Sequence, residues 1–161
     1  MSVFKSQFSR ALEVIKSDNA NIPYPAVSSS GTNTSVTVAS LVDSAATFVT
    51  NNVATGDIVY NTTDGTAATV LVVVDENTLL LNADIFNFAG KSYVVYAASS
   101  QTTIGNAGCF LYVGVGGNIK VTTIGGDIVT FSAAAVGFVL PVQVIKLHAT
   151  GTSATLIDAL W

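Results

Sequence analysis

Charged residues are scarce in this chain of 161 residues, at 10% of the composition against a usual share of about 25%. Six Lys and Arg face ten Asp and Glu, so the net charge is −4. Without a basic surface to neutralise phosphates, nucleic acid is excluded as a partner. Half of the residues are apolar, which excludes an intrinsically disordered chain. A surface so short of charge favours permanent contact between copies of the chain, and a compact monomer with a Ser- and Thr-rich surface is the alternative.

Cysteine and histidine occur once each, as Cys109 and His148. A single cysteine forms no disulfide within the chain, and one Cys with one His falls short of a structural zinc site. His148 has no orienting partner near it in the sequence, so we interpret it as a structural or interface histidine. We interpret Cys109 as a core residue, because no basic neighbour stabilises a thiolate. We therefore expect no catalytic residue, no metal, no cofactor and no enzymatic activity.

Long apolar runs are missing as well. The densest one, Phe131 to Ile145, has 15 residues, whereas a membrane span needs about 20. The first ten residues lack the continuous apolar stretch of a secretory signal. We expect a protein that is made in the cytoplasm and has no membrane partner.

Two short motifs suggest ligands but are more typical of turns. Gly114-Val-Gly116-Gly117 is followed by Asn118-Ile-Lys-Val, which predicts a strand, whereas a dinucleotide site needs a helix there. We predict a hairpin turn at Gly116-Gly117. Asn61-Thr-Thr-Asp64-Gly65 lacks the alternating acidic residues of a calcium loop, so it also predicts a turn.

The N-terminus carries the one helical pattern of the sequence. Phe4, Phe8, Leu12 and Ile15 recur at helical spacing, which predicts a short N-terminal helix or arm. The alternative is that the chain is already extended from Ala11. We assign residues 1–9 to the arm, and we expect Phe4, Phe8 and Leu12 to contact a neighbouring subunit. Trp161 is a further interface candidate, because a Trp at the end of the sequence needs a pocket to bury it.

The remainder of the chain predicts short β-strands separated by Gly-, Asn- and Asp-containing turns. Residues 69–74 and 78–82 predict a hairpin with a three-residue loop. Further strands are expected at 92–97, 109–115, 119–123, 128–131, 139–147 and 154–160. Regular spacing of such strands predicts an all-β protein built as a β-sandwich, a jelly roll or a barrel.

Charge and composition divide the chain into two parts. Residues 28–104 hold six acidic residues against Lys91 alone, whereas the remainder holds five basic and four acidic residues. Flexible Ser- and Thr-rich joints are expected at 28–35 and 99–103. We predict a discontinuous β-sandwich or jelly-roll-like module, residues 10–27 plus 105–161, and an inserted small β-barrel, residues 28–104.

An ordered series of short motifs runs through the C-terminal third of the chain. It comprises Leu111-Tyr-Val-Gly114, Gly116-Gly-Asn-Ile-Lys-Val121, Gly125-Gly-Asp-Ile-Val-Thr-Phe131, Leu140-Pro-Val-Gln-Val144 and Ala149-Thr-Gly-Thr-Ser-Ala-Thr155. The series resembles the head spike-base proteins of tailed bacteriophages and gene transfer agents. In that family a Ser-Asp and a Pro precede the Leu-Tyr-Val-Gly strand almost directly. Ser17-Asp18 and Pro23 resemble that stretch, with residues 28–104 inserted after it.

The resemblance implies a non-enzymatic structural protein of a bacteriophage virion. It would be a capsid decoration or cement protein, or the base of a vertex spike, and would assemble on the head as a homo-oligomer. The implied partners are further copies, in a trimer or pentamer, and the major capsid protein. The implied location is the virion, after synthesis in the host cytoplasm. Two alternatives stay open: a tail or baseplate adaptor, and a receptor- or glycan-binding module with residues 28–104 as its contact surface.

Overall fold

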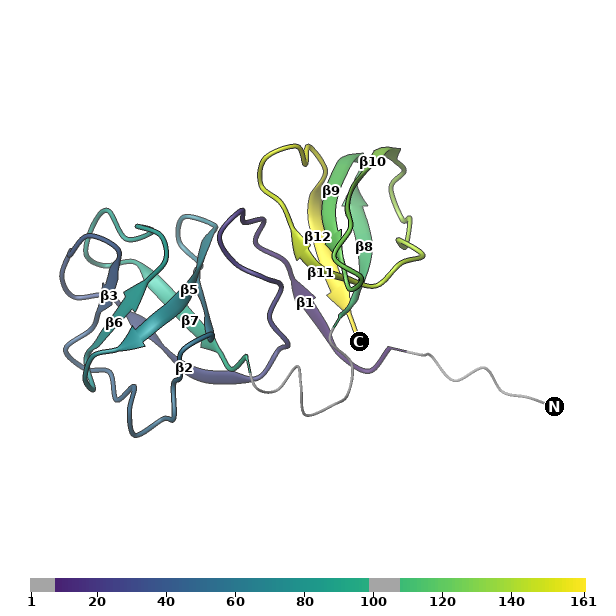
Figure 1. Cartoon of the computed structure of the whole chain (residues 1–161). Helices are drawn as coiled ribbons and strands as arrows, with labels where there is room; N and C mark the ends of the chain where they lie inside the picture. The colour runs from purple at the N-terminus through teal and green to yellow at the C-terminus, as the bar shows by residue number, and fades with distance from the viewer. Residues whose placement is uncertain (1–7, 99–107) are drawn as a thin grey trace.

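The structure is a computed structural model that describes residues 8–98 and 108–161. Within these ranges it contains β-strands and no helix, which confirms the predicted all-β class. The strands form three antiparallel sheets, with the orders β1-β12-β8, β10-β9-β11 and β2-β7-β4-β5-β6-β3 (Figure 1). The sheets are curled and are consistent with a β-sandwich-like fold.

The strand boundaries follow the predicted β-rich segments in the second half of the chain, except that the strand predicted at 139–147 is confined to Val144–Leu147. The strands are β1 (Ala11–Glu13), β2 (Val27–Thr32), β3 (Ser40–Val42), β4 (Ile58–Asn61), β5 (Thr66–Val73), β6 (Thr78–Leu81), β7 (Ser92–Tyr96), β8 (Phe110–Val115), β9 (Gly117–Thr123), β10 (Ile128–Ala134), β11 (Val144–Leu147) and β12 (Thr155–Leu160).

The six-stranded sheet, which we call the half-barrel, uses only residues from Val27 to Tyr96. Its β5–β6 hairpin turns at residues 75–77, as predicted. The sheet curls until the chain after β2 meets β3, where Thr34 N–H donates to the Val42 carbonyl. The chain enters and leaves the half-barrel at one place, because Val27 is paired with Tyr96. Its interior is filled by large apolar side chains: Leu41, Phe48, Val59, Val70, Leu79, Phe86 and Val95.

The two three-stranded sheets, which we call the paired sheets, enclose a second core. Consecutive strands β8 and β9 lie in different sheets, so the predicted hairpin at Gly116-Gly117 is wrong. The chain crosses between the sheets there, and a Cβ on Gly116 would lie 2.7 Å from the Ala134 carbonyl oxygen. Glycine is therefore needed for close approach of two backbones rather than for a tight turn. The core contains Leu111, Val113, Ile119, Val121, Leu140, Val144, Leu147 and Ile157.

A third, smaller core joins the half-barrel to the N-terminal segment. Leu12 and Ile15 pack there against a cluster that includes Tyr60 and Tyr96. Buried Ser17 donates a hydrogen bond from Oγ to the Ala67 carbonyl, at 2.9 Å. The half-barrel takes its strands from Val27 to Tyr96, and the division into two separate modules stays a prediction.

For the residues that the structure describes, the predicted N-terminal helix is wrong, and the alternative of a chain extended from Ala11 is confirmed. Ala11–Glu13 form β1, which pairs with the edge of β12 through Ala11 with Leu160 and Glu13 with Asp158. An extended segment can form main-chain hydrogen bonds with the edge of β12, whereas an isolated helix of one or two turns is only marginally stable. Residues 1–7, including Phe4, lie outside the described residues.

The predicted flexible joint at 28–35 is also wrong in its first half. Residues 27–32 form β2, which pairs along its length with β7. Main-chain pairing with a neighbouring strand compensates for the low strand propensity of Ser and Gly. The second joint, 99–103, lies outside the described residues.

Candidate functional site

The N-terminal interface candidates lie against their own chain. Phe8 is half-buried, and its ring lies 5.5 Å from the ring of Phe110, between centroids. Leu12 is half-buried on β1 against the third core. Both side chains keep part of their surface exposed, so they remain candidates for contact with a neighbour.

Trp161 finds its packing partners within the same subunit. Its ring meets Tyr24 edge-on, with centroids 5.4 Å apart, and packs against the core of the paired sheets. The Arg10 guanidinium lies 5.3 Å from the Tyr24 ring centroid and donates from Nε to the Tyr24 hydroxyl. These contacts show that the pocket predicted for Trp161 is formed largely by this chain itself. The side chain is half-buried there.

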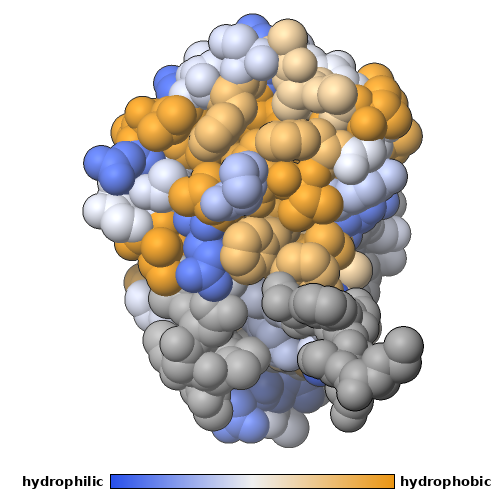
Figure 2. Space-filling view, turned by 90° about the vertical axis from the view of Figure 1, so that its right-hand side faces the viewer, coloured by the Kyte–Doolittle hydropathy of each residue, from blue (hydrophilic) through white to orange (hydrophobic). Residues whose placement is uncertain are grey.

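An apolar rim, which we define as residues 128–139, extends along β10 and the segment after it. Exposed side chains of this rim include Ile128 (63% exposed), Val136 (69%) and Phe138 (41%). The segment then reaches β8, where Val139 is bridged to Tyr112. The side of the molecule that carries β8 and β10 is largely apolar in Figure 2. An exposed apolar patch of this kind marks a protein interaction surface.

A hollow of about 330 Å³ lies within the rim. It is lined by Phe131, by the small residues 132–135 and by Phe138. Two aromatic rings beside alanines give an apolar hollow without a charged group, which suits an apolar side chain of a partner.

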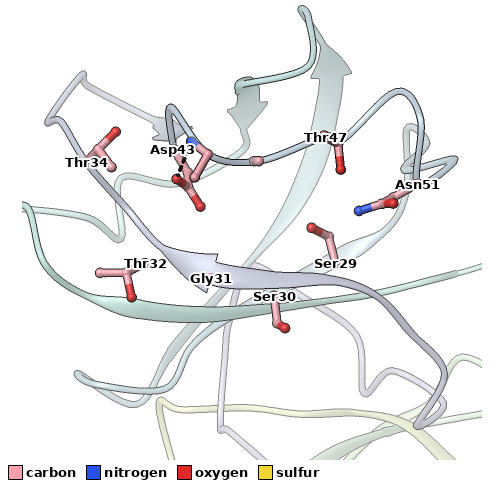
Figure 3. Close-up of a pocket in the computed structure, with 10 residues that line it drawn as sticks. Ser29, Ser30, Gly31, Thr32, Thr34, Asp43, Thr47 and Asn51 are labelled. Carbon is pink, nitrogen blue, oxygen red and sulfur yellow. Dashed lines mark hydrogen bonds between the residues drawn. The ribbon is translucent and has the colours of Figure 1, made fainter.

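A polar cleft of about 360 Å³ lies on the half-barrel, between β2 and the loop after β3. Ser29, Thr47 and Asn51 point toward one another across the cleft in Figure 3, and Asp43 lies at one end. Ser29 and Asp43 are both more than nine-tenths buried. Hydroxyl, amide and carboxylate groups can exchange hydrogen bonds with a ligand that is rich in hydroxyls.

The buried Asp43 carboxylate is held by two donors. Its Oδ2 accepts from the Tyr93 hydroxyl at 2.7 Å, and its Oδ1 accepts from Ala45 N–H at 2.9 Å. Burial, together with the neighbouring Asp43 carboxylate, raises the pKa of Tyr93 well above its ordinary value. Tyr93 therefore remains a donor to Asp43 at neutral pH.

A carboxylate, an imidazole and a hydroxyl lie in a row at the ends of β9 and β11. His148 Nε2 lies 2.8 Å from Thr122 Oγ1, and His148 Nδ1 lies 3.5 Å from Asp18 Oδ1. Asp18 also accepts from Thr150, through both its amide and its hydroxyl. The Thr150 hydroxyl is the largest cause that lowers the pKa of Asp18.

This row has the order of a hydrolase triad, but that chemistry also requires a substrate cleft and donors for an oxyanion. Of the three residues only Asp18 lines the neighbouring cleft of about 250 Å³, and neither His148 nor Thr122 does. We therefore interpret the row as a structural connection: it fixes Asp18 to the ends of β9 and β11. The interpretation of His148 as structural stays a prediction.

Asp18 is the partner of His148 that sequence reasoning missed. The two residues are separated by most of the chain, and only the pairing of the sheets brings them together. In the sequence, Ser17-Asp18 stands out only as part of the stretch that resembles the spike-base proteins. Cys109 lies in the core as expected, and its burial raises the pKa of its thiol to about 12.

The described part of the chain brings together no group of three or more His, Cys, Asp or Glu side chains. None of the described segments forms a helix that could cross a lipid bilayer. Comparisons with models of known protein families, with curated proteins and with solved structures find no match.

Proposed function

We propose that this chain is a non-enzymatic structural protein of a bacteriophage virion, as a capsid decoration or cement protein or a vertex spike base. Its partners are further copies of itself, as a trimer or pentamer, and the major capsid protein. The virion is its location, after synthesis in the host cytoplasm. The resemblance of residues 109–161 to spike-base proteins supports this proposal.

The observation that carries the proposal is the exposed apolar rim. Between Ile128 and Ile145 the sequence contains no charged residue, and several large apolar side chains of the rim are exposed. An obligate interface is more apolar than the rest of a protein surface. The rim therefore fits a contact that stays closed in the assembled particle.

Two measurements test this function. Light scattering on the purified chain should give the mass of an oligomer, and electron microscopy of the phage particle should place the protein on the head. Counting copies per particle distinguishes cement, which is abundant, from a tail or baseplate adaptor, which is present in few copies. A monomer that fails to bind the particle would contradict the proposal.

A second candidate function is binding of a receptor glycan, and the polar cleft on the half-barrel supports it. Thr47 and Asn51 place a hydroxyl and an amide at the cleft. Screening the full chain on a glycan array tests this function. Binding that is lost in Asn51→Ala and Thr47→Ala, and kept in Thr37→Ala outside the cleft, would favour it. Absence of binding to every glycan would count against it.

A further inference from the structure

We propose that β10 pairs edge to edge with β10 of a second copy, antiparallel and across a two-fold axis. This inference rests on the proposed homo-oligomer and names one of its interfaces. It concerns the strand Ile128–Ala134 at the edge of the sheet β10-β9-β11.

The main chain of β10 is paired on one side only. Thr123 N–H donates to the Asp127 carbonyl, and in the register that follows Val129 faces Val121. Hydrogen-bonded pairs alternate along an antiparallel ladder, so the N–H and C=O groups of Ile128 and Thr130 point away from β9. These groups form a free edge that can accept another strand.

Two other edge strands of the paired sheets, β11 and β8, have their outer edges covered by this chain. Ser17 and Ile22 donate their N–H groups to β11, to the carbonyls of Leu147 and Ile145. The segment after β10 covers β8, because Val113 N–H donates to the Phe138 carbonyl. The edge of β10 is left without such a cover in the described residues.

The side chains of β10 are exposed on both faces of the strand. Ile128 is 63% exposed, and Val129, which points to the opposite face, is 38% exposed. Most of the strand is exposed or half-buried, although Phe131 packs against the core. A strand that belongs to a complete sandwich buries one face, whereas β10 leaves Ile128 and Val129 exposed on opposite faces beside its free edge.

A free edge strand normally carries features that prevent pairing, such as Lys or Pro residues. In β10 there is neither, and its one irregularity is a register shift after Phe131. The regular part, Ile128 to Phe131, therefore carries no charge and no proline, and three of its four side chains are apolar. A partner that binds through charged groups finds no charged side chain on this strand. A second, identical strand can pair with it through main-chain hydrogen bonds and apolar contacts.

The geometry of β10 is self-complementary. With the two-fold axis beside Val129, Ile128 of each copy faces Thr130 of the other, and each such pair exchanges two hydrogen bonds. The Val129 side chains of the two copies then meet directly, at a pair whose Cα atoms lie about 4.5 Å apart. The contact continues into the apolar hollow beside Phe131 and Phe138. Because the axis is two-fold, this contact joins two trimers, or two pentamers, of the proposed homo-oligomer into one particle with an even number of copies.

The experiment measures the mass of the full chain by light scattering, for the wild type and for three variants. Thr130→Pro removes an outward N–H without affecting pairing to β9, and Ile128→Lys places a charge on the edge. Both should halve the mass of the oligomer. Leu71→Lys, at a 47% exposed apolar position of the half-barrel, is the matched control and should leave the mass unchanged.

The outcomes separate this inference from the proposed function. A wild-type oligomer with an odd number of copies, or variants that fold and keep the full mass, would overturn the pairing of β10 and leave the homo-oligomer standing. A wild type that is monomeric at every concentration would overturn both.

A cross-linking variant tests the same geometry without weakening the strand. Val129→Cys places two thiols within disulfide distance across the axis, so oxidation should yield a covalent dimer on a non-reducing gel. Leu71→Cys is the control and should yield none. Cys109 is buried and does not compete. Failure of Val129→Cys to cross-link in an oligomer would contradict the proposed register.

Discussion

Ser17 connects parts of the chain that are distant in sequence. Its hydroxyl donates to the Ala67 carbonyl and accepts from the N–H groups of Asn19 and Ala20. The Asn19 carbonyl in turn accepts from Thr69 Oγ1. These hydrogen bonds hold the N-terminal segment against the half-barrel, next to the third core.

Gly31 is required by the packing of the Asp43–Tyr93 pair. A Cβ at this position would lie 2.6 Å from Asp43 Oδ2 and 2.8 Å from the Tyr93 hydroxyl oxygen. Gly31→Ala is therefore expected to lower the free energy of unfolding by about 1–3 kcal/mol through overpacking. Chemical denaturation of the two proteins measures the difference.

The control for Gly31→Ala is Gly125→Ala. A Cβ at Gly125 meets its nearest neighbour at 3.6 Å, which is ordinary contact. This variant should be about as stable as the wild type. Equal stability of both variants would show that the Asp43–Tyr93 pair moves aside easily.

Glu76 makes stability depend on pH in the acid range. Hydrogen bonds from Thr50 and from Val49 N–H lower the pKa of this carboxyl below 4.5. The unfolded chain therefore binds the proton first, so stability is full above pH 4.5 and decreases as the pH falls through the folded-state pKa. Glu76→Gln should make the unfolding free energy less dependent on pH in this window.

Denaturation curves between neutral pH and pH 3 measure the effect of Glu76→Gln. Asp84→Asn is the control, because the described contacts give its side chain no hydrogen bond. A slope against pH that is identical in Glu76→Gln and in the wild type would contradict the role of Glu76.

Among the elements of the fold, strands with strong side-chain patterns could be predicted from the sequence. β5 and β7 consist largely of β-branched and aromatic residues, β6 consists of Thr78 and three leucines, and each lies near its predicted position. The sequence of β2 favours a flexible joint, and that of β1 favours a helix, with a chain extended from Ala11 only as the alternative. Both are strands only because β12 and β7 offer them a main-chain edge, and such long-range pairing leaves no local signal.

The candidate sites also differ in whether they could be recognised from the sequence. The scarcity of charge and the apolar stretch after Ile128 could be recognised in the sequence. The polar cleft could not, because β2 and the loop after β3 meet only when the half-barrel curls. The row from Asp18 to Thr122 depends on the meeting of three segments, and residue spacing carries no information about that meeting.

The N-terminal arm is tested by deleting residues 1–7, which removes Phe4 and leaves β1 intact. If the arm binds a neighbouring subunit, the deletion should lower the mass of the oligomer and leave the melting temperature of the subunit unchanged. Light scattering and thermal circular dichroism measure the two quantities. Phe4→Ser should reproduce the loss, Ser6→Ala should not, and a full-sized oligomer after deletion would exclude a role for the arm.

At the scale of the whole molecule, the scarcity of charge determines how the assembly responds to salt. Salt screens contacts between exposed charges, whereas an apolar contact does not weaken with it. We expect the mass of the oligomer to be the same at low ionic strength and in about 1 M NaCl. Sedimentation at both salt concentrations measures it, and dissociation in high salt would indicate that ion pairs hold the copies together.

The pairing of β1 with β12 places Arg10 beside Trp161, and each donates its N–H to the carbonyl of the other. Because these two positions are neighbours, a short linker could close the polypeptide into a ring. A circularly permuted chain, opened instead at the 75–77 turn, should then fold to the same sheets. Peptides fused before residue 10 or after residue 161 would leave the fold at the same place on its surface, and that place is therefore suited to the display of fused peptides.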